Sequence, residues 1–147
     1  MPKKVKKKLN CVLLVDDNAS DNFLHKMIIQ KAYITNHIEI AENGEEALDF
    51  LTSKCRFGQT ESSYCQPELI LLDINMPVMD GWQFLEEYNR LEEDQKGKAV
   101  IIILTTSSKP DDQARTQRML GNECFKFKPL TSEMINEIMQ KHFPEYL

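Results

Sequence analysis

Two patterns of apolar residues take turns along the chain, short continuous runs and repeats at every third or fourth position, and together they predict alternating strands and helices. Five short runs are rich in apolar and β-branched residues, as strands are: 9–15, 37–41, 69–72, 99–104 and 124–127. The segments that follow them repeat apolar residues every three or four positions, which is the spacing of one helix face. The pattern therefore predicts five consecutive strand–helix units.

Each predicted helix should turn its apolar residues inward. The first, capped by Asn18 or Ser20, should bury Phe23, Leu24, Met27 and Ile28. The inward sets expected of three further helices are Ala47, Leu48 and Leu51; Phe84, Leu85, Tyr88 and Leu91; and Met134, Ile135, Ile138, Met139 and Phe143. The helix that begins at Pro110 is poorly anchored, because only Ala114 is apolar between positions 111 and 118. Residues 53–66 should form a helix end and then an extended loop.

These alternating units predict an α/β domain over residues 9–147, with a doubly wound parallel sheet covered by helices on both faces. In such sheets, ligands bind beyond the carboxyl ends of the strands. Residues 1–8 are expected to be a separate, solvated basic tail, because five of the 18 basic residues lie there.

The charge of the chain excludes some partners. Removing the five tail lysines leaves 13 basic residues against 23 acidic ones, a net charge of −10 for the domain. An acidic body repels phosphates, so we expect no nucleic-acid partner. No apolar run approaches the roughly 18 residues of a membrane helix, so we expect no membrane association and a cytoplasmic location. The four cysteines show no spacing typical of a zinc site.

Polar residues follow four of the predicted strands where each strand ends: Asp16 and Asp17 after the first, Asp73 after the third, Thr105 after the fourth and Lys128 after the fifth. A parallel sheet brings these ends to one edge. Three adjacent carboxylates repel one another, and Mg²⁺ with its preference for oxygen ligands would relieve that repulsion. Asp73 could then attack phosphorus as a nucleophile, while Lys128 and Thr105 neutralise the transferred oxygens.

Four segments carry a family resemblance: VDDN at 15–18, LLDINMPVMDG at 71–81, ILTTS at 103–107 and FKFKPL at 125–130. Their order and spacing resemble the receiver family of two-component signalling, typified by the bacterial chemotaxis response regulator. The resemblance implies a flavodoxin-like (βα)5 fold with strand order 2-1-3-4-5. It also implies a single-domain response regulator, a switch that catalyses its own phosphotransfer and dephosphorylation rather than an enzyme acting on a separate substrate.

The resemblance also implies a role for individual residues. Asp73 is expected to accept the phosphoryl group. Asp17 and Asp73 are expected to bind Mg²⁺ directly with the backbone carbonyl of Asn75, while Asp16 acts through a metal-bound water. Lys128 is expected to pair with the phosphate, and Thr105 is expected to be the switch hydroxyl. Phe125 is expected to be the switch aromatic, at a position where the family often has tyrosine. Asn75 and Ser107 are expected to tune the rate of hydrolysis.

The implied partners are a sensor histidine kinase or phosphotransfer protein as donor and a downstream protein as target. Only 19 residues follow Lys128, so we expect no DNA-binding output domain, and output through the fourth helix, fifth strand and fifth helix. The long loop before the third strand, the LTTS segment and the aromatic C-terminus resemble the phytochrome-associated single-domain receivers, which implies a homodimer. The apolar tip Phe143, Tyr146 and Leu147 would either support it or pack on its own domain.

Three alternatives fit the fold less well. A phosphohydrolase of the haloacid dehalogenase type needs a second acid two residues after its nucleophile, which neither Asp16 nor Asp73 has. A receiver-shaped module that is never phosphorylated would have lost an acid or the lysine, and none is lost. An FMN-binding flavodoxin would carry a glycine-rich phosphate loop after the first strand. The histidines His25, His37 and His142 are expected at the surface or facing partners, and Trp82 is expected to pack.

Overall fold

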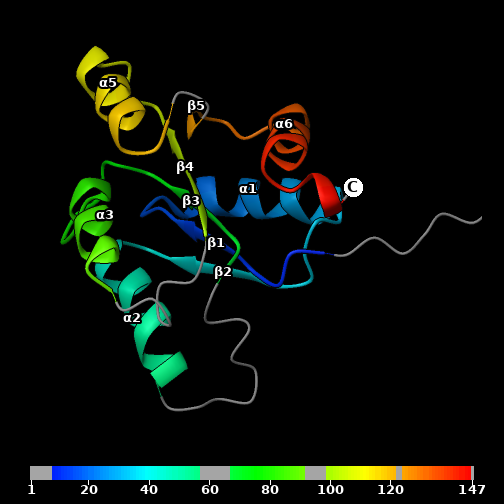
Figure 1. Ribbon diagram of the computed structural model, residues 1–147, viewed down its shortest axis with the longest axis horizontal. Helices are drawn as coiled ribbons and strands as arrows, with labels where there is room; N and C mark the ends of the chain where they lie inside the picture. Colours follow the sequence, from blue (N-terminus) through cyan, green and yellow to red (C-terminus); the bar gives the residue numbers. More distant parts are fainter. Residues whose placement is uncertain (1–7, 57–66, 92–98, 122–123, 147) are drawn as a thin grey trace, which may run out of the picture.

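The computed structural model describes residues 8–56, 67–91, 99–121 and 124–146 (Figure 1). Its centre is a sheet of five parallel strands in the order β2-β1-β3-β4-β5, which confirms the predicted fold class and strand order. The strands are β1 (Val12–Val15), β2 (Ile38–Ala41), β3 (Leu69–Leu72), β4 (Val100–Thr105) and β5 (Phe125–Phe127). The switch in strand order lies at β1 and β3, which are paired in register.

Helices cover both faces of this sheet (Figure 1). On one side lie α1 (Ala19–Ala32) and α6 (Ser132–His142), which is followed by the short helix η3 (Pro144–Tyr146). On the other lie α2 (Gly44–Arg56) and α3 (Gly81–Asn89), while α5 (Pro110–Met119) contacts β5 at the sheet edge. Helix α2 continues to Arg56, as the sequence predicts, and the loop expected after it lies outside the described residues.

The strands divide their apolar side chains between two cores. Leu13 and Val15 of β1 pack with the residues of α2 and α3, whereas Val12 and Leu14 pack with those of α1 and α6. This alternation follows from the period of two in a strand, which places successive side chains on opposite faces. Because both faces are covered, β1, β3 and nearly all of β4 are buried.

Side-chain caps mark where three of the helices begin. Asn18 accepts a hydrogen bond from the backbone N–H of Asp21 at the start of α1. Asp80 and Gln83 form a reciprocal capping box on α3, and Thr131 accepts from the N–H of Met134 on α6. These bonds satisfy backbone donors that the first helical turn leaves without partners. The cap proposed at Asn18 is therefore confirmed.

The predicted inward face of α1 is wrong at Phe23 and Leu24, whereas Ile28 packs against the core as expected and Met27 is half-buried. The buried residues of this helix are Asn22, His25 and Ile29, whereas Phe23 and Leu24 are 69% and 40% exposed. The helix is thus rotated from the orientation that its large apolar residues alone would favour. Its polar residues face the sheet because they meet polar groups at the end of β1, as the Asn22 amide does when it donates to the carbonyl of Asp16.

The inward residues predicted for the other helices agree with the structure. Phe84, Leu85 and Tyr88 are buried on α3, and Ile135, Ile138 and Met139 on α6. Helix α5 buries only Thr116, so its weak anchoring is confirmed. The guanidinium of Arg115 on α5 lies 4.5 Å from the ring centroid of Trp82 on α3, and Trp82 itself packs against the core as expected.

The C-terminal segment folds back onto its own domain. Phe143 and Tyr146 are buried, and the Tyr146 hydroxyl lies 2.6 Å from the carboxylate of Glu68. Phe143 and Tyr146 thus pack on their own domain, which is one of the two uses considered for this apolar tip. Leu147 and residues 1–7 of the basic tail lie outside the described residues.

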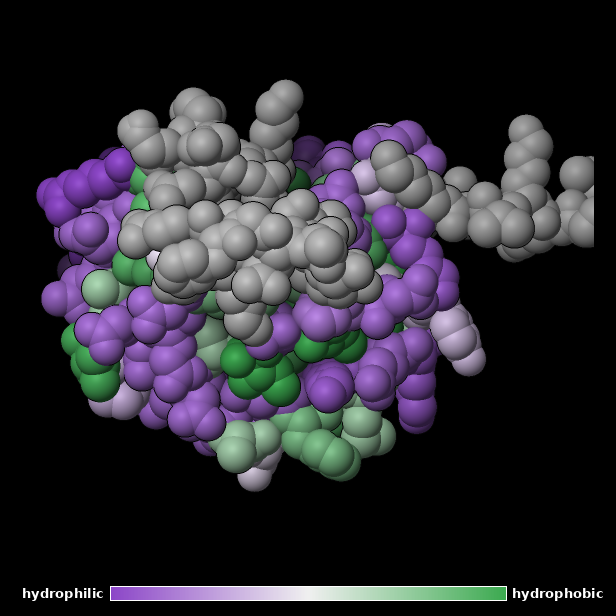
Figure 2. Space-filling view, turned by 90° about the horizontal axis from the view of Figure 1, so that it is seen from below, coloured by the Kyte–Doolittle hydropathy of each residue, from purple (hydrophilic) through white to green (hydrophobic). Residues whose placement is uncertain are grey.

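The surface seen in Figure 2 is mainly polar, with apolar side chains in small groups between polar ones. Large apolar residues that are exposed include Val78, Tyr33 and Phe127. None of the helices in the described part of the chain has the length and apolar character needed to cross a membrane.

Candidate functional site

Three carboxylates meet at the carboxyl end of the sheet. Asp16 and Asp17 directly follow β1, and Asp73 directly follows β3. The two strand ends are held together because the N–H of Asp73 donates to the carbonyl of Val15 at 2.9 Å. One oxygen from each of the three carboxylates lies within 4.8 Å of the others. The structure thus brings together the acids that the sequence placed on one edge.

The surroundings of these acids differ. Asp16 and Asp73 are buried, at 4% and 7% exposed, while Asp17 is exposed. Burial raises the pKa of the Asp73 carboxyl, and the negative charge of Asp16 adds to the effect. The charge of Lys128 and a hydrogen bond with the Thr105 side chain oppose it without cancelling it. The ionised form of the Asp73 carboxyl is therefore unfavourable in this environment, and a nearby cation would stabilise it.

Lys128 provides a positive charge for this cluster. Its Nζ lies 2.6 Å from Asp16, 2.7 Å from Asp21 and 3.4 Å from Asp73. The N–H of Lys128 also donates to the carbonyl of Thr105, which ties the end of β5 to the end of β4. Burial lowers the pKa of Lys128, but hydrogen bonds with Asp16 and Asp21 and the charges of Asp73 and Asp16 outweigh it, and the net shift is upward.

Asp21 is a member of the site that the sequence did not reveal. It lies in the first turn of α1, where an acid commonly stabilises a helix through its dipole. Here its carboxylate instead reaches Lys128, which is 107 positions away in the sequence. Nothing in the spacing of Asp21 distinguishes the two uses, because the contact depends on how α1 packs beside the end of β5.

The loop after Asp73 is pinned by close backbone packing at Gly81. The N–H of Gly81 donates to the carbonyl of Ile74, and a Cβ at position 81 would lie 2.7 Å from the Asp73 carbonyl oxygen. Glycine is therefore required there for steric reasons. The N–H of Asn75 points toward Asp73 Oδ1 at 3.5 Å, and Asn75 itself is exposed beside the cluster.

Of the residues expected to transmit a signal, Thr105 contacts the acidic cluster. Thr105 ends β4, is 0% exposed and accepts from the N–H of Ser107. Its side chain also forms a hydrogen bond with Asp73. The hydroxyl of Ser107 donates to Asp112 in the first turn of α5 at 2.5 Å. Phe125 is buried, and its ring packs edge-on against that of Phe127.

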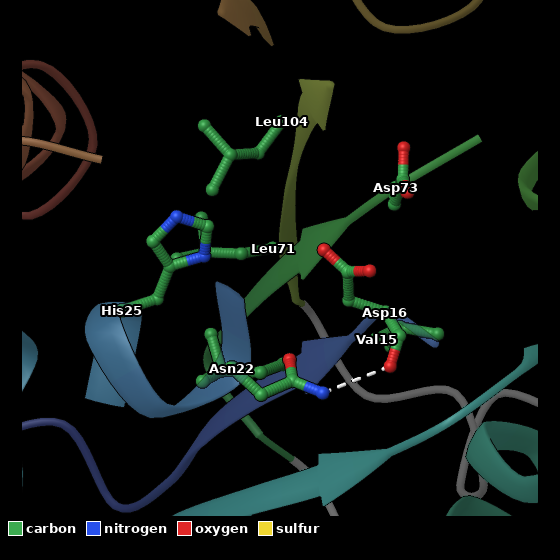
Figure 3. A pocket seen from close by; sticks show the side chains of 8 residues that line it. Val15, Asp16, Asn22, His25, Leu71, Asp73 and Leu104 are labelled. Atoms are coloured by element: carbon green, nitrogen blue, oxygen red, sulfur yellow. Dashed lines mark hydrogen bonds between the residues drawn. The ribbon is translucent and has the colours of Figure 1, made fainter. Parts of the chain in front are cut away.

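A small cavity lies directly behind the carboxylates. Asn22 and His25 of α1 form one wall, while Asp16 and Asp73 line the other side, as Figure 3 shows. His25 is only 2% exposed, so the expectation that it lies at the surface is wrong. Burial lowers the pKa of His25, with the charges of Asp21, Lys128 and Asp16 as smaller influences. His37 and His142 are half-buried.

The carboxylates fit a hard divalent cation. Mg²⁺ prefers oxygen ligands and is usually bound by one or two carboxylates with water and phosphate oxygens. Asp17 is exposed and can be reached from solvent, while buried Asp73 gains from a second positive charge. The donor set and its electrostatics therefore suit such an ion, with Asp16, Asp17 and Asp73 as the residues to hold it.

Comparison with protein families gives one clear result. The pattern of the response regulator receiver domain matches residues 12–140 of this chain. Among curated proteins, the chain is 30% identical to the probable methanogenesis regulatory protein FilR2 of Methanothrix harundinacea over 88% of this chain and 79% of that protein. It is 35% identical to the response regulator Rcp1 of Synechocystis over 69% of this chain and 65% of Rcp1.

Solved structures agree with this result. A two-component response regulator from Cytophaga hutchinsonii superposes with a TM-score of 0.78 at 29% identity, covering 92% of this chain and 97% of that one. The bacteriophytochrome response regulator AtBRR gives 0.71 at 28% identity, covering 91% and 92%. The Mn²⁺-bound form of Rcp1 gives 0.66 at 27% identity, covering 92% and 94%. The resemblance to phytochrome-associated receivers is therefore also supported.

Proposed function

The chain belongs to the response regulator receiver family, and on this premise we propose that it is a phosphorylation switch that accepts a phosphoryl group on Asp73 from a phosphohistidine donor. The observation that carries the proposal is the position of Asp73. Its carboxylate lies in a cluster with Asp16 and Asp17 and 3.4 Å from the ammonium of Lys128. A nucleophile, an acidic ion-binding group and a fixed cation thus share one site.

The transfer uses the side chains as follows. A carboxylate oxygen of Asp73 forms a bond to phosphorus, and the bond between phosphorus and the histidine nitrogen breaks, leaving its electron pair on the imidazole. Lys128 faces the phosphoryl oxygens from the β5 side and stabilises their negative charge. The Thr105 hydroxyl lies on the β4 side, where it can donate to the same oxygens.

We propose that Asp17 and Asp73 hold Mg²⁺ directly with the Asn75 backbone carbonyl, and that Asp16 holds it through water. When bound, the ion neutralises the carboxylates and the phosphoryl oxygens. The Mn²⁺-bound form of Rcp1 supports a divalent ion in a related protein. The raised pKa of Asp73 supports it independently, because burial beside Asp16 makes this carboxylate unfavourable without a nearby cation.

The proposed output face is formed by α5, β5 and α6. Helix α5 buries a single residue and begins three residues after Ser107, so it can move at low cost. A phosphoryl group that binds Thr105 and Lys128 alters the ends of β4 and β5 and the loop into α5. The downstream partner would be a protein that distinguishes the two positions of this face, and the protein itself would act on no separate substrate.

The proposal is tested by labelling with acetyl phosphate and Mg²⁺, followed by separation of phosphorylated from unmodified protein. We expect wild type to be labelled and to lose the label in time. Asp73→Asn should remain unlabelled although it keeps the side-chain shape. Asp49→Asn, which changes an exposed acid on α2, is the matched control and should be labelled as wild type is. Equal labelling of Asp73→Asn and the control would refute the assignment.

A further inference from the structure

The cavity behind the acidic cluster has a volume of about 10 Å³. It lies between α1 and the carboxyl halves of β1, β3 and β4, and its walls combine apolar strand residues with four polar side chains: Asp16, Asn22, His25 and Asp73. Apolar cavities of this size remain dry, but polar ones commonly hold water. The four polar side chains in the lining therefore favour a bound water in this cavity over an empty space.

Two buried polar atoms require a partner here. Asn22 Oδ1 and His25 Nε2 are buried, and neither atom forms a hydrogen bond within the described residues. Their side chains belong to residues that are 5% and 2% exposed, and Figure 3 shows both reaching the cavity from α1. A buried polar atom that lacks a hydrogen bond costs about 1–3 kcal/mol, so such atoms are rarely left without one.

We propose that this cavity binds one ordered water, which joins His25 and Asn22 on α1 to the Asp16 carboxylate. The volume corresponds to about one water, and a buried water needs two to four polar partners. Asn22 Oδ1 accepts a hydrogen bond, while His25 Nε2 donates or accepts according to its tautomer, so water is a suitable partner for each atom. A Mg²⁺ ion is not suited to this position, because its six ligands must be mostly oxygen atoms.

The water makes His25 a positioning residue for Asp16. The other contacts of Asp16 come from the N–H of Asn18 to Oδ1 at 2.9 Å, from Lys128 to Oδ2 at 2.6 Å and from the Asn22 amide to the backbone carbonyl. Each of these groups contacts a different oxygen of the residue. A water bound to His25 adds a link to the middle of α1, so the position of this carboxylate depends on a side chain that does not itself touch it.

The first experiment looks for the water itself. A high-resolution crystal structure should show a single density peak within hydrogen-bonding distance of His25 Nε2 and Asn22 Oδ1. In solution, rotating-frame NMR should show cross-peaks between the carbon-bound ring protons of His25 and a long-lived water. These cross-peaks should arise from direct dipolar contact and not from chemical exchange. A cavity without density and without cross-peaks would overturn the proposal.

The second experiment tests the positioning role with three variants. His25→Leu removes the water's partner, His25→Gln retains a polar group, and Ile29→Val trims a fully buried residue one turn further along the same face of α1. The readout is the backbone N–H of Asn18, which donates to Asp16. We expect a shifted signal and severalfold faster hydrogen exchange in His25→Leu, recovery in His25→Gln and no change in Ile29→Val. Equal effects of His25→Leu and Ile29→Val would show a merely structural role.

A Mg²⁺ titration of the same proteins adds a readout that rests on the proposed function. Loss of a group that orients a metal ligand typically weakens affinity about 10–100-fold. We expect a loss at the lower end of this range in His25→Leu and affinity near that of wild type in His25→Gln. If wild type itself fails to bind Mg²⁺, the proposed function is in error, whereas the water and the Asn18 signal still decide this inference.

Discussion

Replacement of Lys128 by methionine should destabilise the domain strongly. The change keeps a long apolar stem and removes the ammonium that Asp16, Asp21 and Asp73 share at 2.6, 2.7 and 3.4 Å. Removing one partner of a buried ion pair costs about 3–5 kcal/mol, because the other charge is left buried without compensation. Asp16 and Asp73 fit this case, with side chains 6% and 9% exposed. Asp21 is 31% exposed and adds less, since water screens it.

This loss can be measured as a change in melting temperature. For a domain of about 150 residues, 1 kcal/mol corresponds to roughly 2–4 °C, so the expected decrease is about 6–20 °C. The pKa of Lys128 is raised above its ordinary value of 10.5, so its stabilising contribution is complete below pH 10.5 and is lost only as the pH rises further. Circular dichroism melts near pH 7 with a chelator present therefore report the full effect.

Lys126→Met is the matched control, because it removes the same charge two residues earlier on β5. Its partner Glu137 lies at 3.3 Å and is 65% exposed, and such surface pairs contribute at most about 1 kcal/mol. A divalent cation should restore part of the stability of Lys128→Met by offsetting the same carboxylates, and Asp16→Asn in that background should do so as well. Equal melting temperatures for the two lysine variants would refute the view that Lys128 neutralises this cluster.

Four further expectations follow from the geometry. Gly81→Ala should lower the free energy of unfolding by about 1–3 kcal/mol and slow phosphorylation, because the new Cβ meets backbone atoms. Gly44→Ala is the control and should lower it less, because the nearest atoms there belong to the flexible side chain of Met79. The reverse order in chemical denaturation would contradict this. Asp73→Asn should raise the melting temperature at neutral pH. The pKa of Asp73 is raised above its ordinary value of 3.8, so wild-type stability falls as the pH rises above 3.8, and the uncharged asparagine avoids this loss. Identical pH profiles of melting temperature for the two proteins would oppose this. Beryllofluoride with Mg²⁺ should change hydrogen exchange across the described part of residues 106–127, and an effect confined to the acidic cluster would place the output face elsewhere. Deleting residues 1–8 should leave the melting temperature nearly unchanged, and a fall of more than about 5 °C would show that the tail is docked.

The strands and the edge that carries the site follow from sequence pattern, because strand ends in a parallel sheet can be placed without knowing side-chain contacts. Asp16, Asp73, Thr105 and Lys128 were located in this way, each as the polar residue at the end of an apolar run. The rule requires only that successive strands run in the same direction, and here all of the strand pairs are parallel.

The orientation of α1 could not be predicted in this way. Counting large apolar residues favoured a face with Phe23 and Leu24, yet the helix buries Asn22 and His25 beside the carboxylates. A functional site places polar groups in the interior, and this breaks the pattern on which the prediction depends. Asp21 was missed for a related reason, since its contact with Lys128 exists only once α1 has packed in this orientation.

The central claim is that Asp73 accepts the phosphoryl group, and mapping the modified residue tests it most directly. Protein treated with acetyl phosphate and Mg²⁺ would be reduced with borohydride to fix the acyl phosphate position, digested and sequenced by mass spectrometry. The expected result is a mass change at Asp73, with Asp16, Asp17 and Asp21 unmodified. Modification at one of those three acids with Asp73 intact would contradict the account.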